Sequence, residues 1–577
     1  MSEENKPVAV APPPPPPPAR PTAPPPKNPG FVTFSVDGHE VIAKPGTNMI
    51  DAVKTVGTDI PYYCYHPRLS IAANCRMCMV EVNNGAKLVP ACQTAISEGQ
   101  KVITNSAKVK EQQRAVMEFL LLNHPVDCSI CDQAGECKLQ DYYMRYDHKP
   151  SRLAGNKVLR NKRKVLGPLV VLDQERCVLC TRCVRFMDEV AKEPQLGVFG
   201  RGSHERIDVF PGLGGGLTSN YSGNTVDICP VGALLNREFR FRARAWFLSA
   251  APSVCTGCSR GCSTYADFMG QETYRYRPRE NDAINKSWMC DQGRLTYKEL
   301  NQNRALNAVL GRGQDAREAT RAEAVKYAAL KLKAHLNNVH VLVSAVASNE
   351  DLLASMTFVR DTLGMKTVYV GGRPQGDADH FLMLADKNPN RRGLTDVAAA
   401  LGITLKPFSE LTQALDANQV KALYAIGTEV PEDATVFSNR LANVEVFIAQ
   451  TVHENPIARL SHALLPASTH VEDEGTFTQE AGITQRFRRA YPPKGESSPH
   501  WKWAAEISTE MGTAMAFSNS REVFKTLASN VPSLANYAWD KEAPMNQRRT
   551  PMSPLAASAD GRPPGYREGG VPRVRGI

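Results

Sequence analysis

Fifteen cysteines and one histidine are the residues of this chain whose types and spacing could do chemistry. All fifteen cysteines lie between Cys64 and Cys290, and the 287 residues that follow have none. Disulfides need an oxidising compartment, and the N-terminus carries Glu3, Glu4 and a proline tract where a signal peptide has an apolar segment. We therefore expect a cytoplasmic setting, in which clustered cysteines indicate metal binding.

Spacing divides these residues into four sets, and the sets with their ligand candidates are Cys64-x10-Cys75-x2-Cys78-x13-Cys92, His124-x3-Cys128-x2-Cys131-x5-Cys137, Cys177-x2-Cys180-x2-Cys183 with the remote Cys229, and Cys255-x2-Cys258-x3-Cys262-x27-Cys290. The first set has the long gap and distant fourth cysteine of a plant-type ferredoxin loop, which holds a [2Fe–2S] cluster, although its first gap is longer. The third set, with Cys229-Pro230, matches the bacterial [4Fe–4S] pattern. Zinc is the alternative, but zinc sites favour paired short knuckles.

His124 stands where the second set would need a fourth cysteine. Four sets of four need one ligand more than the fifteen cysteines supply, and His124 completes the count. An imidazole is neutral where a thiolate is negative, so it should raise the reduction potential of its cluster, as in Rieske centres. Two alternatives stay open: a structural histidine at a helix end, and an exchange of roles between Cys137 and Cys229, as in two-cluster ferredoxins.

The sequence around the first set predicts a β-grasp ferredoxin domain over 31–105. Two β-rich runs flank Asp37-Gly38, a strong hairpin signal, and a short helix capped by Thr47 or Asn48 follows. Residues 107–123 predict a helix that Ser106 caps and Pro125 ends. This helix belongs to the second segment, 106–146, and places His124 at its C-terminal end.

The rest of the chain divides into segments that differ in cysteine content and in the pattern of apolar residues. We expect a [4Fe–4S] ferredoxin-like domain over 165–245, a further [4Fe–4S] cluster domain over 252–305 and an α/β domain over 306–540. In that domain, short apolar runs at 339–345, 367–372, 422–427 and 444–449 predict strands that alternate with helices such as 350–364. This alternation predicts a parallel sheet with helices on both faces. The fold class is thus multidomain, α+β and α/β.

The two ends of the chain are compositionally biased. Residues 1–30 form a proline-rich leader and 541–577 a Pro/Gly/Arg-rich tail, and both predict disorder. The net charge of +10 lies partly in that tail and in the basic run 152–164. No nucleic-acid motif accompanies these charges, so we expect solvated loops or partner contacts. No apolar run is long enough to cross a bilayer.

Four stretches resemble the large iron–sulfur subunit of respiratory complex I, which is the G, or 75 kDa-type, subunit of bacterial NADH:quinone oxidoreductase. They are YYCYHPRLSIAANCRMCMVEV, NHPVDCSICDQAGECKLQD, CVLCTRCVRF and VDICPVGAL, which fall within 31–300. The resemblance implies one [2Fe–2S] cluster on the first set and a [4Fe–4S] cluster on each of the second and third. The fourth set, which only some members have, corresponds to the cluster of molybdopterin oxidoreductases and gives a third [4Fe–4S] cluster.

What the resemblance implies about function is an electron conduit without a catalytic residue of its own. NADH would be oxidised at FMN on a partner subunit, and electrons would pass to quinone-proximal iron–sulfur subunits, coupled to proton translocation by the whole complex. The chain would be peripheral, at the cytoplasmic face of the bacterial inner membrane, and would touch the membrane only through the complex. No nucleic acid is expected, and GLGGG at 212–216 indicates a loop rather than an NADH fingerprint.

The C-terminal half resembles a shortened molybdopterin oxidoreductase, most closely at 462–487. No cysteine lies beyond Cys290 to bind molybdenum, so we expect a scaffold without molybdopterin, although Ser or Asp ligation stays open. The alternatives to a complex I subunit are the iron–sulfur subunit of an NAD-linked formate dehydrogenase or hydrogenase, and a zinc-binding scaffold.

Overall fold

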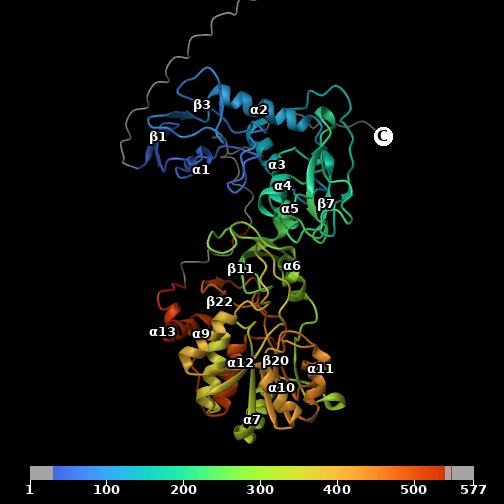
Figure 1. Cartoon of the computed structure of the whole chain (residues 1–577), viewed down its shortest axis with the longest axis vertical. Coiled ribbons are helices and arrows are strands. Elements are labelled where there is room, and N and C mark those ends of the chain that lie inside the picture. Colours follow the sequence, from blue (N-terminus) through green and yellow to red (C-terminus); the bar gives the residue numbers. More distant parts are fainter. Residues whose placement is uncertain (1–29, 148, 540–546, 549–577) are drawn as a thin grey trace, which may run out of the picture. The chain divides into compact units, whose positions relative to one another are not determined.

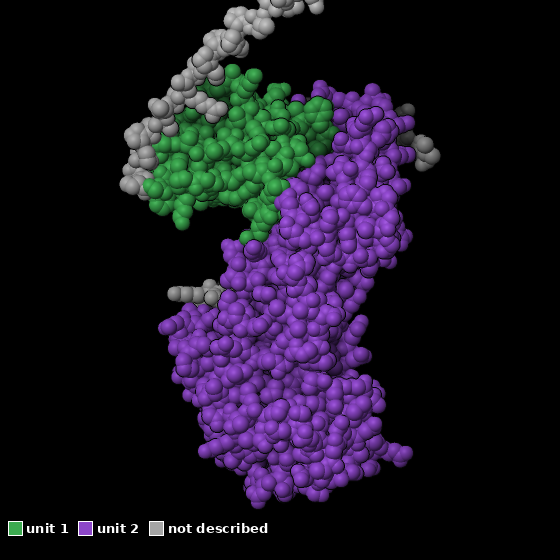
Figure 2. Space-filling model, viewed as in Figure 1, with its two compact units in different colours: residues 1–120 green, residues 121–577 purple. Residues whose placement is uncertain are grey.

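The computed structural model describes residues 30–147, 149–539 and 547–548. The chain forms two compact units, residues 1–120 and 121–577, which are coloured separately in Figure 2. The predicted leader lies outside the described residues except for Gly30. The predicted tail does so except for Gln547 and Arg548.

The first unit contains a small sheet that begins with a tight hairpin. β1 (Val32–Val36) pairs antiparallel with β2 (His39–Ala43), and the turn residues Asp37 and Gly38 have φ angles of 50° and 91°. These positive φ angles are those of the turn that an Asp-Gly pair favours, so the predicted hairpin is confirmed. α1 (Met49–Lys54) begins after Asn48, whose side chain accepts a hydrogen bond from the Ile50 amide.

Three further strands complete this sheet: β3 (Met79–Val82), β4 (Val89–Pro90) and β5 (Lys101–Ile103). The strand order is β2-β1-β5-β3-β4, with β5 parallel to β1. α1 covers the sheet and buries Met49, Ile50 and Val53 against Phe34 and Val36. α2 (Ala107–Leu122) follows, and the amide of Val109 donates to the Ser106 hydroxyl, as its predicted cap requires.

The first part of the second unit carries short elements that hold loops in place. α3 (Lys138–Tyr142) begins directly after Cys137, α4 (Arg182–Arg185) contains Cys183, and α5 (Gly223–Asp227) ends shortly before Cys229. A three-stranded sheet of β6 (Lys164–Val165), β7 (Val170–Leu172) and β10 (Leu234–Asn236) brackets the last two helices in sequence. β8 (Leu196–Phe199) and β9 (Arg206–Val209) form a separate hairpin.

A second antiparallel sheet follows at 249–278. It consists of β11 (Ser249–Val254), β12 (Ser263–Met269) and β13 (Glu272–Pro278), and α6 (Asp291–Leu295) begins after Cys290. Within the segment predicted as a disordered tail, β24 (Gln547–Arg548) pairs with the outer edge of β11. An open strand edge offers unpaired amides and carbonyls, which explains why a tail segment can add there.

The largest element of the second unit is a sheet in the order β15-β14-β21-β20-β19-β16-β17-β18. Its parallel part contains the four predicted strands, which the structure places at β16 (Val339–Ser344), β17 (Thr367–Gly371), β19 (Ala422–Ile426) and β20 (Val446–Thr451), together with β18 (Thr404–Lys406) and β21 (Ala463–Pro466). At one edge β14 (Ala308–Leu310) pairs antiparallel with β21 and with β15 (Arg317–Ala319). The predicted parallel sheet therefore carries an antiparallel edge that the alternation of strands and helices did not indicate.

Helices cover both faces of this sheet, as the alternation predicted (Figure 1). Val341 and Val343 of β16 face one core, which contains residues from α7 (Arg321–Ala334), α8 (Asn349–Thr357), α9 (Arg391–Leu401), α12 (His500–Glu510) and α13 (Ser520–Asn530). Leu342 faces the other core, with α10 (Phe408–Asp416) and α11 (Ala434–Arg440). In the described part of the chain, no helix has the length and apolar character that crossing a bilayer requires.

Candidate metal centres

The structure brings the four cysteines of the first set together in the first unit. The side chain of Cys64 lies within hydrogen-bonding contact of Cys75 and Cys92, and Cys92 contacts Cys78 in the same way. The loops that carry them are tied by the Ala91 amide, which donates to the Cys78 carbonyl at 2.9 Å, and by the Asn48 side chain, which donates to the Cys92 carbonyl at 2.6 Å. Four sulfurs held this closely form a soft donor set suited to an iron–sulfur cluster.

The second set borders one cavity of about 100 Å³ in the second unit. His124, Cys128, Cys131 and Cys137 all line it, with apolar neighbours such as Leu139. Burial, with the nearby positive charges of Arg176 and Lys157, lowers the pKa of His124 to about 4. The imidazole is therefore neutral near pH 7, which is the form that can bind a metal.

A glycine allows the second set to close. A Cβ built on Gly232 would lie 2.2 Å from the Cys131 sulfur, so any larger residue would push that sulfur away. Gly232 follows Cys229-Pro230 in the chain, and the Pro230 carbonyl accepts a hydrogen bond of 3.0 Å from the amide of Lys138, next to Cys137. The turn after the remote cysteine of the third set thus forms one wall of the second.

The third set lines a separate, tighter cavity of about 20 Å³. Its members Cys177, Cys180, Cys183 and Cys229 all face this space. Burial raises the pKa of Cys177 to about 12 and that of Cys180 to about 11. Deprotonated sulfurs here would need a metal to offset the loss of water. The sequence left the roles of Cys137 and Cys229 open, and the structure places Cys137 with the second set and Cys229 with the third.

The fourth set is buried on all sides: Cys255, Cys258, Cys262 and Cys290 are each less than 8% exposed. Backbone amides point at two of the sulfurs, from Gly257 to Cys255 at 3.5 Å and from Gly293 to Cys290 at 3.3 Å. A Cβ on Gly293 would lie 2.8 Å from the Cys255 sulfur, so this glycine also makes room for the set.

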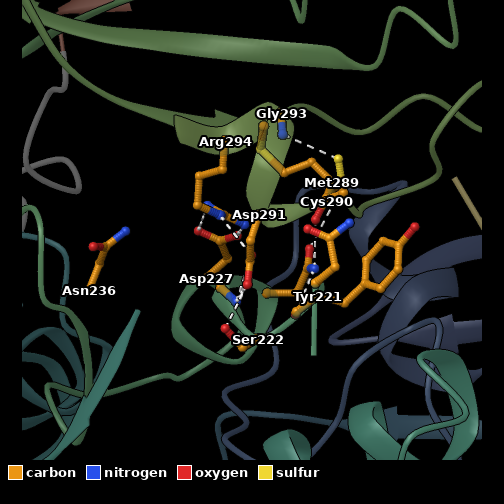
Figure 3. Close-up of polar contacts among 12 residues, drawn as sticks. Tyr221, Ser222, Asp227, Asn236, Met289, Cys290, Asp291, Gly293 and Arg294 are labelled. Atoms are coloured by element: carbon orange, nitrogen blue, oxygen red, sulfur yellow. Dashed lines mark hydrogen bonds and ion pairs between the residues drawn. The ribbon is translucent and has the colours of Figure 1, made fainter. Parts of the chain in front are cut away.

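A buried polar network ties the fourth set to the segment that leads to Cys229 (Figure 3). Arg294 of α6 pairs with Asp227 at the end of α5, and Asp291 accepts hydrogen bonds from the Ser222 hydroxyl at 2.6 Å and the Gly223 amide at 2.9 Å. Next to them, the Asn224 side chain exchanges hydrogen bonds with the backbone before Cys290, at Met289. The distant ligands of the third and fourth sets therefore belong to one packed framework.

A further cavity of about 80 Å³ lies beyond the carboxyl ends of the parallel strands, where ligands bind in open α/β sheets. Ser344, Gly427 and Val452 line it from the strand ends. The stretch 462–487, which resembles a molybdopterin oxidoreductase, adds Ser468, Thr469, His470 and Asp473. Burial lowers the pKa of His470 to about 3 and raises that of Asp473 to about 7. The strand-end rule could have located this cavity from the sequence, but its lining residues could not be named in advance.

In the residues that the structure describes, no three His, Cys, Asp or Glu side chains are placed to hold a single metal ion. The second and third sets instead each surround a cavity. The sequence missed two residues of the second cavity that carry charge, Asp127 and Arg176. Asp127 stands directly before Cys128 in the quoted stretch, whereas only the fold brings Arg176 to that site.

Four family models match consecutive segments of the chain. They describe a 2Fe-2S iron-sulfur cluster binding domain at 31–107, an NADH-ubiquinone oxidoreductase-G iron-sulfur binding region at 113–152, an NADH-quinone oxidoreductase subunit 3 ferredoxin-like domain at 167–235 and a molybdopterin oxidoreductase at 277–510. The first three segments contain the first three cysteine sets, and the fourth begins just before Cys290.

Curated relatives of this chain are named as subunits of NADH-quinone or NADH-ubiquinone oxidoreductase. The chain is 37% identical over 333 residues to the G subunit of NADH-quinone oxidoreductase of Rickettsia conorii, covering 58% of this chain and 49% of the relative. It is 38% identical over 341 residues to the 75 kDa subunit of NADH-ubiquinone oxidoreductase of Reclinomonas americana, covering 59% and 49%. Identity to the G subunit of Streptomyces coelicolor is 32% over 467 residues, covering 78% and 54%.

The chain thus spans about half the length of the curated relatives that it matches. Among solved structures, a chain of an NAD+-reducing [NiFe]-hydrogenase aligns with 28% identity over 37% of this chain and 91% of that chain, at a TM-score of 0.34. A score this low does not establish a common overall fold. The sequence alignments do establish descent: the chain is a homologue of the iron–sulfur proteins named as the G, or 75 kDa, subunit of NADH-quinone oxidoreductase.

Proposed function

We propose that this chain is an electron-conducting iron–sulfur subunit in the peripheral arm of an NADH:quinone oxidoreductase, complex I. The observation that carries the proposal is the convergence of sixteen candidate ligands into four sets in a homologue of the large iron–sulfur subunit. The first set would hold a [2Fe–2S] cluster and each of the other three a [4Fe–4S] cluster. When bound, these clusters supply one-electron redox steps at potentials that the protein sets.

The chain's own residues do three things in this function. They bind: each set presents cysteine sulfurs, and the second adds the neutral imidazole of His124. They exclude water: the cysteines of the fourth set and two of the third are buried, and the second cavity has apolar walls. They tune: backbone amides of Leu179, Gly257 and Gly293 donate to Cys177, Cys255 and Cys290, and hydrogen bonds to sulfur shift cluster potentials.

The partners would be an NADH- and FMN-binding subunit that delivers electrons and quinone-proximal iron–sulfur subunits that accept them. The chain would then be peripheral, at the cytoplasmic face of a bacterial inner membrane. We further propose that the cavity at the strand ends holds no molybdopterin, because the chain has no cysteine beyond Cys290 to bind molybdenum. Stoichiometric molybdenum in the purified complex would contradict that and favour the formate dehydrogenase alternative.

Metal analysis tests the proposal directly. One binuclear and three tetranuclear clusters predict about 14 iron atoms per chain, with matching acid-labile sulfide. The measurement is iron, sulfide and zinc content of the anaerobically purified protein, together with EPR spectra of the reduced form. An iron content near ten would remove one tetranuclear site, and zinc in place of iron would leave only the zinc-scaffold alternative.

A further inference from the structure

Arg176 lies next to both the second and the third cysteine sets. Its side chain lines the cavity of His124, Cys128, Cys131 and Cys137, and the residue is only 4% exposed. Its backbone ends a short 3-10 turn (Gln174–Arg176) that leads straight into Cys177, the first ligand of the third set. Its guanidinium donates to the carbonyl of Gly232, the glycine that lets the Cys131 sulfur fit.

The guanidinium is held by two carboxylates that differ in position. Asp127, which also lines the cavity, accepts from Arg176 at 3.0 Å, and Asp173, which is not among the lining residues, lies 3.1 Å from the Arg176 Nε. Lys162 reaches the same group from outside, at 2.5 Å from Asp127 and 2.6 Å from Glu175, with its side chain 46% exposed. One positive and one negative charge of this network thus face the second set directly.

Buried charges act strongly on a group that changes its own charge, because little water screens them. A cluster on the second set gains one negative charge on reduction. A fixed positive charge beside it favours the reduced form, and a fixed negative charge favours the oxidised form. The positive charge of Arg176 also lies near the Cys131 sulfur and near His124. There it acts to lower the pKa of both groups.

We propose that the Arg176–Asp127 pair sets the reduction potential of the His124 centre, with Arg176 raising the potential and Asp127 lowering it. This inference rests on the proposed function, since it assumes a cluster on the second set. It adds a tuning device that is independent of the histidine ligand. Because the backbone of Arg176 adjoins Cys177, the same residue also positions the first ligand of the third set.

Redox-titrated EPR of the intact complex tests the pair through opposite shifts. Arg176→Gln should lower the potential of the His124 centre, and Asp127→Asn should raise it, each by about a tenfold change in the equilibrium constant, which is about 59 mV for a one-electron couple. The double variant should return close to the wild-type value. Lys162→Gln is the matched control: it removes a charge from the same network at a half-exposed position and should shift the potential far less.

The variants separate a tuning role from a structural one. Arg176→Lys keeps the charge and loses the fork that joins the Gly232 carbonyl to Asp127, so it should hold the potential near that of the wild type. If Arg176→Gln fails to assemble the cluster, Asp127→Asn still decides: an unchanged or lowered potential overturns the inference. Equal shifts in Lys162→Gln and Arg176→Gln would also overturn it. Absence of iron from the wild-type protein would instead refute the proposed function. Failure of the proposed function is thus distinguishable from failure of the tuning role.

Discussion

Replacement of Cys290 by alanine should destabilise the second unit by several kcal/mol and impair its assembly, because it removes the one distant ligand of the fourth set. Cys255, Cys258 and Cys262 lie close in sequence, whereas Cys290 closes a loop of 27 residues. Metal binding that closes such a loop contributes folding free energy directly, at about 10 kcal/mol apparent for structural zinc. Cys290 also caps α6 at its N-terminus, where its sulfur accepts a hydrogen bond from the Gly293 amide.

The destabilisation caused by Cys290→Ala should extend beyond the fourth set through the polar network of Figure 3. Arg294 is 3% exposed and depends on Asp227, so a displaced α6 would leave buried charges unpaired, which is costly. Asp227 lies two residues before Cys229. We therefore expect Cys290→Ala to weaken cluster retention at the third set as well, with the first set unaffected.

The measurements are thermal unfolding, iron content and NADH-to-quinone turnover of whatever variant complex assembles, normalised to flavin. Turnover should survive in the assembled complexes that keep the cluster of the third set, if the fourth cluster is a structural element without a redox partner beyond it. Met289→Leu, a volume-conserving change at the preceding buried residue, is the control and should cost less than about 1.5 kcal/mol. A collapse of turnover in a complex that retains its other clusters would place the fourth cluster on the electron path.

Local features of the fold could be predicted from the sequence because short-range chemistry decides them. Asp37-Gly38 determines its hairpin through positive φ angles, and Asn48 caps α1 through its own side chain. Alternation of apolar runs with helices predicted the layered α/β domain. The run at 444–449 shows the limit of this reasoning: the strand begins two residues later, at Val446, because backbone pairing with β19 and β21 decides its ends.

Long-range features could not be predicted in the same way. The antiparallel edge at β14 depends on a contact with β21 more than a hundred residues away in sequence. The grouping of Cys137 and Cys229 was open because spacing alone fits either arrangement, whereas the cavities separate them. The roles of Gly232 and Arg176 at the second set follow from the fold alone, since neither residue belongs to that set's motif.

His124→Cys should retain a cluster on the second set and lower its potential by on the order of 100 mV. The imidazole is neutral, whereas a cysteine ligand binds as thiolate and adds one negative charge, which opposes reduction. Rieske centres, in which two histidines replace two cysteines, lie a few hundred millivolts above plant-type ferredoxins, and one such exchange should give part of that difference. The cavity accepts the change because Arg176 and Lys157 supply positive charge near position 124.

Redox-titrated EPR identifies the affected centre, since the signals of the other three should keep their potentials. His340→Ala is the control: burial lowers the pKa of this histidine too, but it lies on β16 and lines none of the cysteine cavities. If no signal moves in His124→Cys, His124 is a structural histidine at a helix end and the second set has three ligands from this chain. If the potential falls, adding Asp127→Asn should raise it part of the way back to the wild-type value. The new thiolate at position 124 and the Asp127 carboxylate would both face the cluster, and the asparagine removes the second of these negative charges.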